Sequence, residues 1–141
     1  FRRVRLRSEV LPLLEEVLDG GVSAALARTA TQLREDLDML DELADALLAS
    51  ARCVPGVDVP GVDVPGLGVT ALRSAPAPLR RRALRRWLLD AGVAELTDPQ
   101  LRAVDGLVGC WRGQGGVAVP GGFVVGRAHG RLHIDRAPAT S

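Results

Sequence analysis

The chain has 141 residues and a formal net charge of +1 at pH 7, which allows one domain with a real core and gives no global basic signal. With no Tyr, two Phe and two Trp, it has little aromatic surface on which nucleic-acid bases could stack. No apolar run approaches the length of a membrane-spanning helix, so we expect no membrane partner.

All the basic residues are Arg, because the chain contains no Lys. Arg keeps its charge and makes planar, bidentate contacts that suit phosphate and RNA, although codon bias in a GC-rich genome would give the same composition. Cys53 and Cys110 lie far apart without metal-ligand partners, which predicts a reducing setting, a cytoplasmic protein and no metal site. Because the chain opens on Phe1 and not on Met, we expect it to be a piece of a longer protein.

Helical patterns dominate the first third of the chain. Residues 7–18 predict a helix, with Pro12 tolerated near its first turn and Gly20 and Gly21 ending it. Residues 22–51 predict one long helix with an apolar seam of the coiled-coil type. The seam contains Leu26, Ala30, Leu33, Leu37, Leu40, Ala44, Leu47 and Ala51. It predicts a helix packed on neighbours along its length, and the alternative is a coiled coil that forms a homodimer.

A pentapeptide repeat, VPGVDVPGVDVPGLG, follows at residues 54–68. Its Pro-Gly pairs fit the two central positions of type II turns, so residues 53–69 are predicted to form a loop lengthened by local duplication. Residues 69–72 are predicted to add a short strand.

Residues 78–92 have the strongest helical pattern of the chain and read PLRRRALRRWLLDAG. Pro78 suits the first turn and Gly92 suits a left-handed C-terminal cap. The apolar stripe of this helix consists of Leu84, Trp87, Leu88 and Ala91. The opposite arc carries Arg81, Arg82, Arg85 and Arg86. One face is therefore built for a core, and the other presents fixed positive charge.

The last third of the chain predicts one more helix and a small β element. Thr97 and Gln100 form a capping box at the start of the helix. Its apolar side carries Leu101, Val104, Leu107, Val108 and Trp111, and the glycines from Gly113 onward end it. Strands are predicted at residues 117–119, 123–127 and 131–135, before a disordered tail at residues 137–141. The predicted fold class is α+β, mostly helical, with about four helices, one of them long, and a small C-terminal antiparallel β element.

No complete active site is recognisable in the sequence. His129 and His133 lack a third ligand for zinc, and the glycines of residues 113–116 follow a helix, the wrong order for a phosphate-binding loop. Two arginine clusters remain as candidate phosphate-binding sites. They are Arg2, Arg3, Arg5 and Arg7, and Arg80, Arg81, Arg82, Arg85 and Arg86. The alternative is that these arginines pair with the acidic face of the long helix, formed by Glu35, Asp36, Asp38, Asp41, Glu42 and Asp45.

Four blocks, in this order, carry a resemblance to a known family. They read RVRLRSEVLPLLEE, ARTATQLREDLDMLDELA, RRRALRRWLLDAG and VPGGFVVGRAHGRLHI. Over nearly the whole chain they resemble the C-terminal part of tRNA(Ile)-lysidine synthetases, in the actinobacterial form. Members of that family carry an N-terminal nucleotide-binding domain with an SGGxDS-type PP-loop, a motif that is absent from these 141 residues.

The resemblance implies an ATP-dependent ligase that joins lysine to the wobble cytidine of an isoleucine tRNA with a CAU anticodon. It places ATP and Mg in the absent catalytic domain and no cofactor in this chain, so we expect the chain alone to be inactive. It also implies a connecting helix at residues 1–20 and a helical tRNA-binding domain at residues 21–136.

The resemblance also suggests which residues contact tRNA. Arg5 and Arg7 match the family's R-x-R before the V-L-P-L-L helix, and the arginines at residues 81–86 match its R-R-x-x-[IL]-R-R-W-L block. The tRNA-binding candidates are Arg5, Arg7, Arg81, Arg82, Arg85, Arg86 and Arg127. Two other classes stay open: a helical structural module that dimerises through the seam, and an arginine-rich regulator that binds nucleic acid without enzymology.

Overall fold

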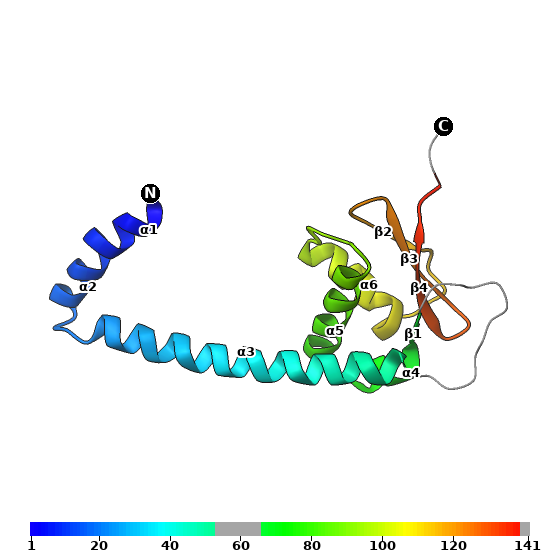
Figure 1. Ribbon diagram of the computed structural model, residues 1–141, viewed down its shortest axis with the longest axis horizontal. Coiled ribbons are helices and arrows are strands. Elements are labelled where there is room, and N and C mark those ends of the chain that lie inside the picture. Colours follow the sequence, from blue (N-terminus) through cyan, green and yellow to red (C-terminus); the bar gives the residue numbers. More distant parts are fainter. Residues whose placement is uncertain (53–65, 139–141) are drawn as a thin grey trace. The chain divides into compact units, whose positions relative to one another are not determined.

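The computed structural model describes residues 1–52 and 66–138 (Figure 1). The chain divides into two compact units, residues 1–39 and the residues from 40 onward. The helices are α1 (Arg2–Arg5), the π-helical segment η1 (Leu6–Val10), α2 (Leu11–Val17), α3 (Val22–Arg52), α4 (Val69–Ser74), α5 (Ala77–Asp90) and α6 (Asp98–Gly109). The strands are β1 (Leu67–Gly68), β2 (Val117–Val119), β3 (Phe123–Ala128) and β4 (Arg131–Arg136). The predicted α+β class is confirmed.

The first helix begins earlier than predicted and is not a regular α-helix throughout. It starts at Arg2 instead of Arg7 and contains the π-helical segment η1 directly before α2. Pro12 occupies the first turn of α2 and has no N–H for the usual helical hydrogen bond. A π-helical stretch before the proline is one way in which a helix accommodates that missing donor.

A side-chain cap joins α2 to α3. Asp19, Gly20 and Gly21 all have positive φ and reverse the chain between the two helices. Glu15 of α2 then accepts a hydrogen bond of 2.6 Å at Oε1 from the backbone N–H of Ser23, in the first turn of α3. This hydrogen bond lowers the pKa of the Glu15 carboxyl.

The long helix is confirmed, but the prediction that its seam is packed along its whole length is wrong. Leu26, Leu33 and Leu37 are exposed, Leu33 to 56%. Burial is confined to the last turns, where Ala44 and Leu48 join the core of the second unit. A helix of 31 residues is roughly 46 Å long, about one and a half times the roughly 30 Å diameter of a small domain, so only part of it finds neighbours.

The second unit is built on a four-stranded antiparallel sheet with the order β1-β4-β3-β2. Val125 pairs with Ile134 in the central hairpin, whose two-residue turn, His129–Gly130, has positive φ at both positions. The strand predicted at residues 69–72 is wrong, because these residues form α4. The strand lies just before them, where Leu67 pairs with Leu132 and is fully buried.

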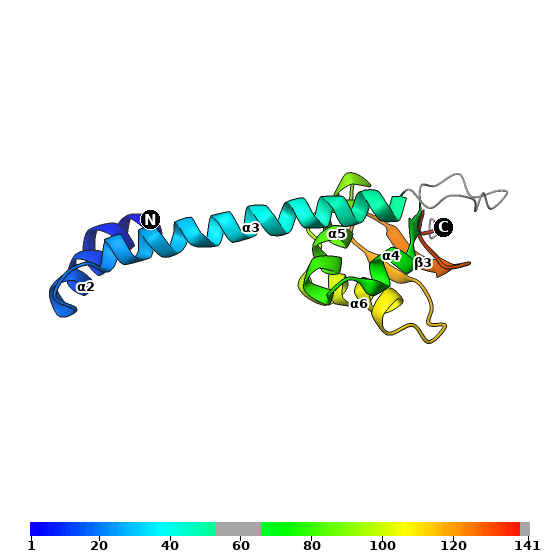
Figure 2. The ribbon, with the colours of Figure 1, turned by 90° about the horizontal axis from the view of Figure 1, so that it is seen from below.

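Helices α5 and α6 lie together on one side of the sheet (Figure 2). Three of the four residues of the predicted apolar stripe of α5 enter the core: Leu84 and Leu88 are fully buried and Trp87 is 4% exposed. The prediction is wrong for Ala91, which follows the last residue of α5 and is exposed. The predicted caps are also confirmed. Gly92 has a φ of 92° and ends α5, with the N–H of Val93 bonded to the Leu88 carbonyl at 2.9 Å. Thr97 and Gln100 form the capping box of α6.

Parts of two other predictions lie outside the described residues. These are residues 53–65 of the loop and residues 139–141 of the tail. At the near end of the tail, the N–H of Ala137 donates to the Gly122 carbonyl at 2.8 Å. Over residues 1–52 and 66–138, no helix has both the length and the apolar character that crossing a membrane requires.

Candidate nucleic-acid interface

The four arginines predicted on the outer arc of α5 all have an acceptor within the chain. Arg82 Nη1 lies 2.7 Å from Asp41 Oδ1 of α3, and Arg81 Nε lies 3.3 Å from Asp105 Oδ2 of α6. Arg85 Nη1 donates to the Leu96 carbonyl at 3.2 Å. Arg86 Nε lies 3.4 Å from an oxygen of Asp90, one turn along the same helix. The ion pair of Arg82 with Asp41 agrees with the alternative stated above, in which these arginines pair with the acidic face of the long helix.

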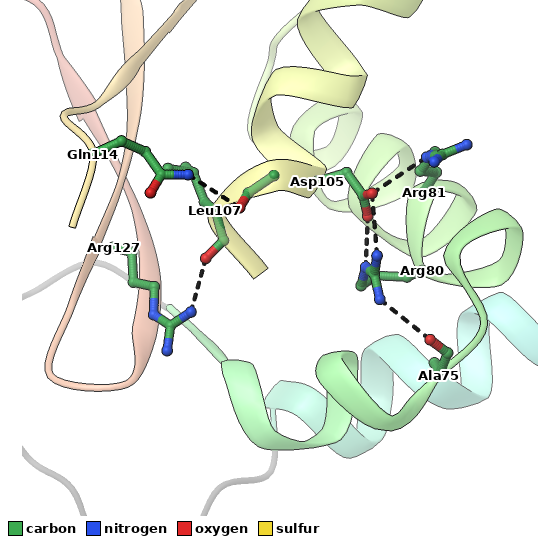
Figure 3. Close-up of polar contacts among 8 residues, drawn as sticks. Ala75, Arg80, Arg81, Asp105, Leu107, Gln114 and Arg127 are labelled. Carbon is green, nitrogen blue, oxygen red and sulfur yellow. Dashed lines mark hydrogen bonds and ion pairs between the residues drawn. The ribbon is translucent and has the colours of Figure 1, made fainter. Parts of the chain in front are cut away.

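Arg80 is not a surface arginine, although the sequence placed it in the same candidate cluster. It is 7% exposed, and its Nε and Nη2 donate to the two oxygens of Asp105, the latter at 3.1 Å (Figure 3). Its Nη1 donates to the carbonyl of Ala75 at 3.3 Å. Gly109 leaves room for this guanidinium, since a Cβ there would lie 2.6 Å from Nη2. Arg80 therefore joins α5 to α6 and cannot contact phosphate.

The predicted pair Arg5 and Arg7 belongs to the first unit. Both are exposed, and Arg5 Nη2 lies 2.9 Å from Glu9 Oε2. Arg7 lines a shallow hollow of about 430 Å³ together with Arg3, Val4 and Leu6. Arg3 and Arg7 are the charged residues of this hollow.

Arg127, the last predicted contact residue, stands in a different environment. It lines a hollow of about 500 Å³ at the end of α6, together with Arg73 of α4 and with Trp111 and Arg112 that follow α6. Arg73 and Arg127 also line a second hollow of about 450 Å³ beside it. Among the described residues that line these two hollows there is no Asp or Glu. Three arginines thus share one concave surface, and no carboxylate of the described residues lies in its walls.

Arg127 is fixed in place by the end of α6. Its Nη1 donates to the Leu107 carbonyl at 2.9 Å (Figure 3). Gln114 Nε2 donates to the carbonyls of Gly106 and Cys110 at 3.1 and 3.2 Å. The Gly106 carbonyl also accepts the backbone N–H of Cys110 at 3.0 Å, whereas Arg127 supplies a donor to the Leu107 carbonyl in the last turn of α6. The positive charge of Arg127 reduces the negative potential at that helix end. An arginine has five N–H donors, so Arg127 keeps donors for a ligand.

Trp111 was predicted on the apolar side of the last helix, and this prediction is wrong. α6 ends at Gly109, and Trp111 lies beyond it, 38% exposed. The guanidinium carbon of Arg127 lies 4.7 Å from the centre of the indole ring. This distance is typical of a cation–π contact, which holds the ring and the guanidinium together.

The chemistry that this surface offers is anion binding. Arginine guanidinium groups make charge-assisted, bidentate hydrogen bonds with phosphate oxygens. Within residues 1–52 and 66–138, no three His, Cys, Asp or Glu side chains come together in a way that could hold a metal ion. No step of phosphoryl transfer is assigned to these residues.

Sequence reasoning missed Arg73, Arg112 and Trp111 as functional candidates. Each stands alone or as a pair in its segment, and only the fold brings α4, the end of α6 and β3 to one place. A weak signal was available, because Trp111 and Arg112 adjoin each other directly after a helix, before a glycine-rich turn.

This part of the chain is similar to known proteins. Residues 67–133 match the family model of the TilS substrate binding domain. The chain is 57% identical over 137 residues to a tRNA(Ile)-lysidine synthase of Rhodococcus erythropolis, an alignment that covers 94% of the chain and 39% of that relative. It is 56% identical over 141 residues to the tRNA(Ile)-lysidine synthase of Nocardia farcinica, covering 96% of the chain and 41% of the relative. It is 51% identical over 143 residues to the tRNA(Ile)-lysidine synthase of Mycobacterium tuberculosis, an alignment that covers 98% of the chain and 42% of the relative.

The chain thus spans about two fifths of the length of the curated relatives that it matches. Arg73, Arg112, Trp111 and Arg127 all fall within the matched residues 67–133.

Proposed function

We propose that the chain is the C-terminal, tRNA-binding part of a tRNA(Ile)-lysidine synthase, because residues 67–133 match the family model of the TilS substrate binding domain. The relatives that support this assignment bear that name and match the chain over nearly all of its length. The ligand is then the tRNA itself, an isoleucine tRNA with a CAU anticodon.

The observation that carries the proposal is the concave surface formed by Arg73, Arg112 and Arg127. An RNA backbone presents closely spaced phosphates, and neutralising them releases counterions, which drives binding. No carboxylate of residues 1–52 and 66–138 lines this surface, so its arginines can offer their charge to these phosphates without first giving up an ion pair with such a residue. We therefore place the main phosphate contacts at this surface.

The other predicted arginines are secondary contacts in this proposal. Arg81, Arg82 and Arg86 each lie against a carboxylate, which a phosphate would have to replace. Arg85 and Arg5 likewise have acceptors in the chain, and Arg7 is exposed in the first unit. Their contribution per residue is smaller for this reason.

We assign the catalytic chemistry to a part of the synthase outside the two fifths of its length that this chain matches. The PP-loop motif of the family is absent from these 141 residues. ATP, Mg and lysine therefore bind elsewhere, and the chain by itself forms no lysidine. Incubating it with ATP, lysine and unmodified tRNA tests this point, and lysidine above background would contradict it.

Binding is tested directly with a fluorescently labelled, unmodified transcript of the CAU isoleucine tRNA. Its anisotropy is followed as the chain is added at several salt concentrations. We expect saturable binding whose association constant falls steeply as salt rises, because phosphate contacts release counterions. Absence of saturable binding at low salt, or affinity that does not change with salt, would contradict the proposal.

A further inference from the structure

The two tryptophans of the chain have opposite environments. Trp87 is 4% exposed and belongs to the core, whereas Trp111 is 38% exposed and lines the hollow at the end of α6. Trp111 makes no part of the apolar core, so core packing does not account for its presence there. A large exposed aromatic ring at the rim of a basic surface is therefore a candidate contact for a ligand.

Contacts with neighbouring residues position the indole ring of Trp111. Arg127 lies 4.7 Å from the indole centre and is itself bonded to the Leu107 carbonyl at 2.9 Å. The segment after Trp111 is also fixed, because Gln114 Oε1 accepts from the N–H of Arg112 at 2.6 Å. A preorganised aromatic plane binds a flat partner with little loss of conformational entropy.

The neighbours of the ring select the chemistry of that partner. Arg73 and Arg112 line the same hollow of about 500 Å³, and no Asp or Glu does so among the described residues. An aromatic ring beside fixed positive charge is the combination by which proteins bind unpaired nucleotides, stacking the base and neutralising the phosphate. A base inside a duplex is already stacked on both faces and cannot use the ring.

We propose that Trp111 stacks an unpaired base of the bound RNA, while Arg73 and Arg112 contact the phosphates that flank it. This inference rests on the proposed function, because it describes how tRNA occupies the surface. It adds that the surface selects an unpaired nucleotide through the tryptophan ring. The arginines alone would bind the phosphate backbone of paired and unpaired RNA alike.

The test uses the fluorescence of the chain itself with a short RNA oligonucleotide, either single-stranded or annealed to its complement. Trp87 is buried, so quenching by RNA reports on Trp111. We expect the single strand to quench the fluorescence and the duplex to leave it nearly unchanged at equal occupancy. Equal quenching by both forms would overturn the proposal.

Three variants separate stacking from charge. Trp111→Leu should weaken single-strand binding roughly tenfold, and Trp111→Phe should retain most of the affinity. The control Leu89→Ala, at an exposed position outside the hollow, should match the unmodified chain. Trp111→Leu should leave the salt dependence of tRNA binding unchanged. If tRNA binds with its full salt dependence but Trp111→Leu and Trp111→Phe behave alike, only the stacking proposal fails. If neither RNA nor tRNA binds at all, the proposed function fails with it.

Discussion

The guanidinium of Arg80 and the carboxylate of Asp105 form a buried two-point ion pair that joins α5 to α6 (Figure 3). Arg81, the next residue, reaches the same carboxylate from a more exposed position, at 3.3 Å. Neighbouring arginines in one run thus have different roles. The first belongs to the structure of the domain, and the others lie at its surface.

Removing one partner of this pair should be costly. Asp105→Ala leaves the Arg80 charge buried without its acceptor, so we expect a loss of about 3 to 5 kcal/mol in the free energy of unfolding. The double variant Arg80→Met/Asp105→Leu removes both charges and should be much closer to the unmodified chain. Urea unfolding measures both, and a double variant as unstable as Asp105→Ala would contradict this explanation.

Trp87 should be a core anchor with no part in binding. It is 4% exposed, and Trp87→Ala leaves a large cavity between α5 and the rest of the core, so we expect a loss of about 3 to 5 kcal/mol. Leu89→Ala, at an exposed position on the same helix, is the control and should change stability little. A Trp87→Ala variant with the same melting temperature as the unmodified chain would show that this helix face is not packed.

The capping box of α6 should contribute a smaller, measurable amount. The Thr97 hydroxyl accepts from the N–H of Gln100 at 3.4 Å, and Gln100 Oε1 accepts from the N–H of Thr97 at 3.0 Å. Thr97→Ala should therefore cost about 1 kcal/mol of stability. Thr70→Ala, at an exposed position in α4, serves as the control. Equal effects of the two changes on the unfolding midpoint would rule out a specific role for the cap.

The cap between α2 and α3 should depend on pH. The N–H of Ser23 donates to the Glu15 carboxylate, which lowers the pKa of Glu15 in the folded chain. A carboxyl whose pKa is lowered by folding stabilises the fold above its unfolded pKa, and this stabilisation is lost as the pH falls through the folded value. NMR titration of Glu15 in the folded chain and in urea should show the lower pKa in the folded chain. The same pKa in both states would exclude the cap.

The local elements were largely predictable because short-range patterns determine them. The capping box at Thr97, the Gly92 cap and the apolar stripe around Trp87 each depend on neighbours within one or two helical turns. Residues 69–72 were misassigned because their apolar character fits a strand or a helix equally well, and the pairing of Leu67 with Leu132 decides between them.

The candidate site was less predictable, because it is made by tertiary contacts. Arg127 was identified, but its neighbours Arg73 and Trp111 come from segments far away in the sequence. The run on α5 has more arginines, yet the fold brings Asp41 and Asp105 within reach of two of them. Charge density along the sequence therefore does not measure the charge that is available at the surface.

The α5 arginines can be tested as a set. Changing Arg81, Arg82, Arg85 and Arg86 to Gln retains helix propensity, so the helix should persist. We expect the slope of log association constant against log salt for tRNA binding to become shallower than in the unmodified chain. The change should be smaller than the loss of four full phosphate contacts would give, because each arginine already has an acceptor in the chain. Circular dichroism and melting temperature check the fold. Unfolding without any change in tRNA affinity would make these arginines purely structural.

The most direct measurement is the salt dependence of tRNA binding in the double variant Arg73→Gln/Arg112→Gln. Both arginines are exposed, and no carboxylate among the described residues lines their hollow, so the fold should be unaffected. We expect the variant to lose about two phosphate contacts. Each lost contact should make the slope of log association constant against log salt shallower by roughly 0.7 to 0.9. An unchanged slope in this variant, together with a flattened slope in the four-residue α5 variant, would contradict the proposal and move the tRNA interface to α5.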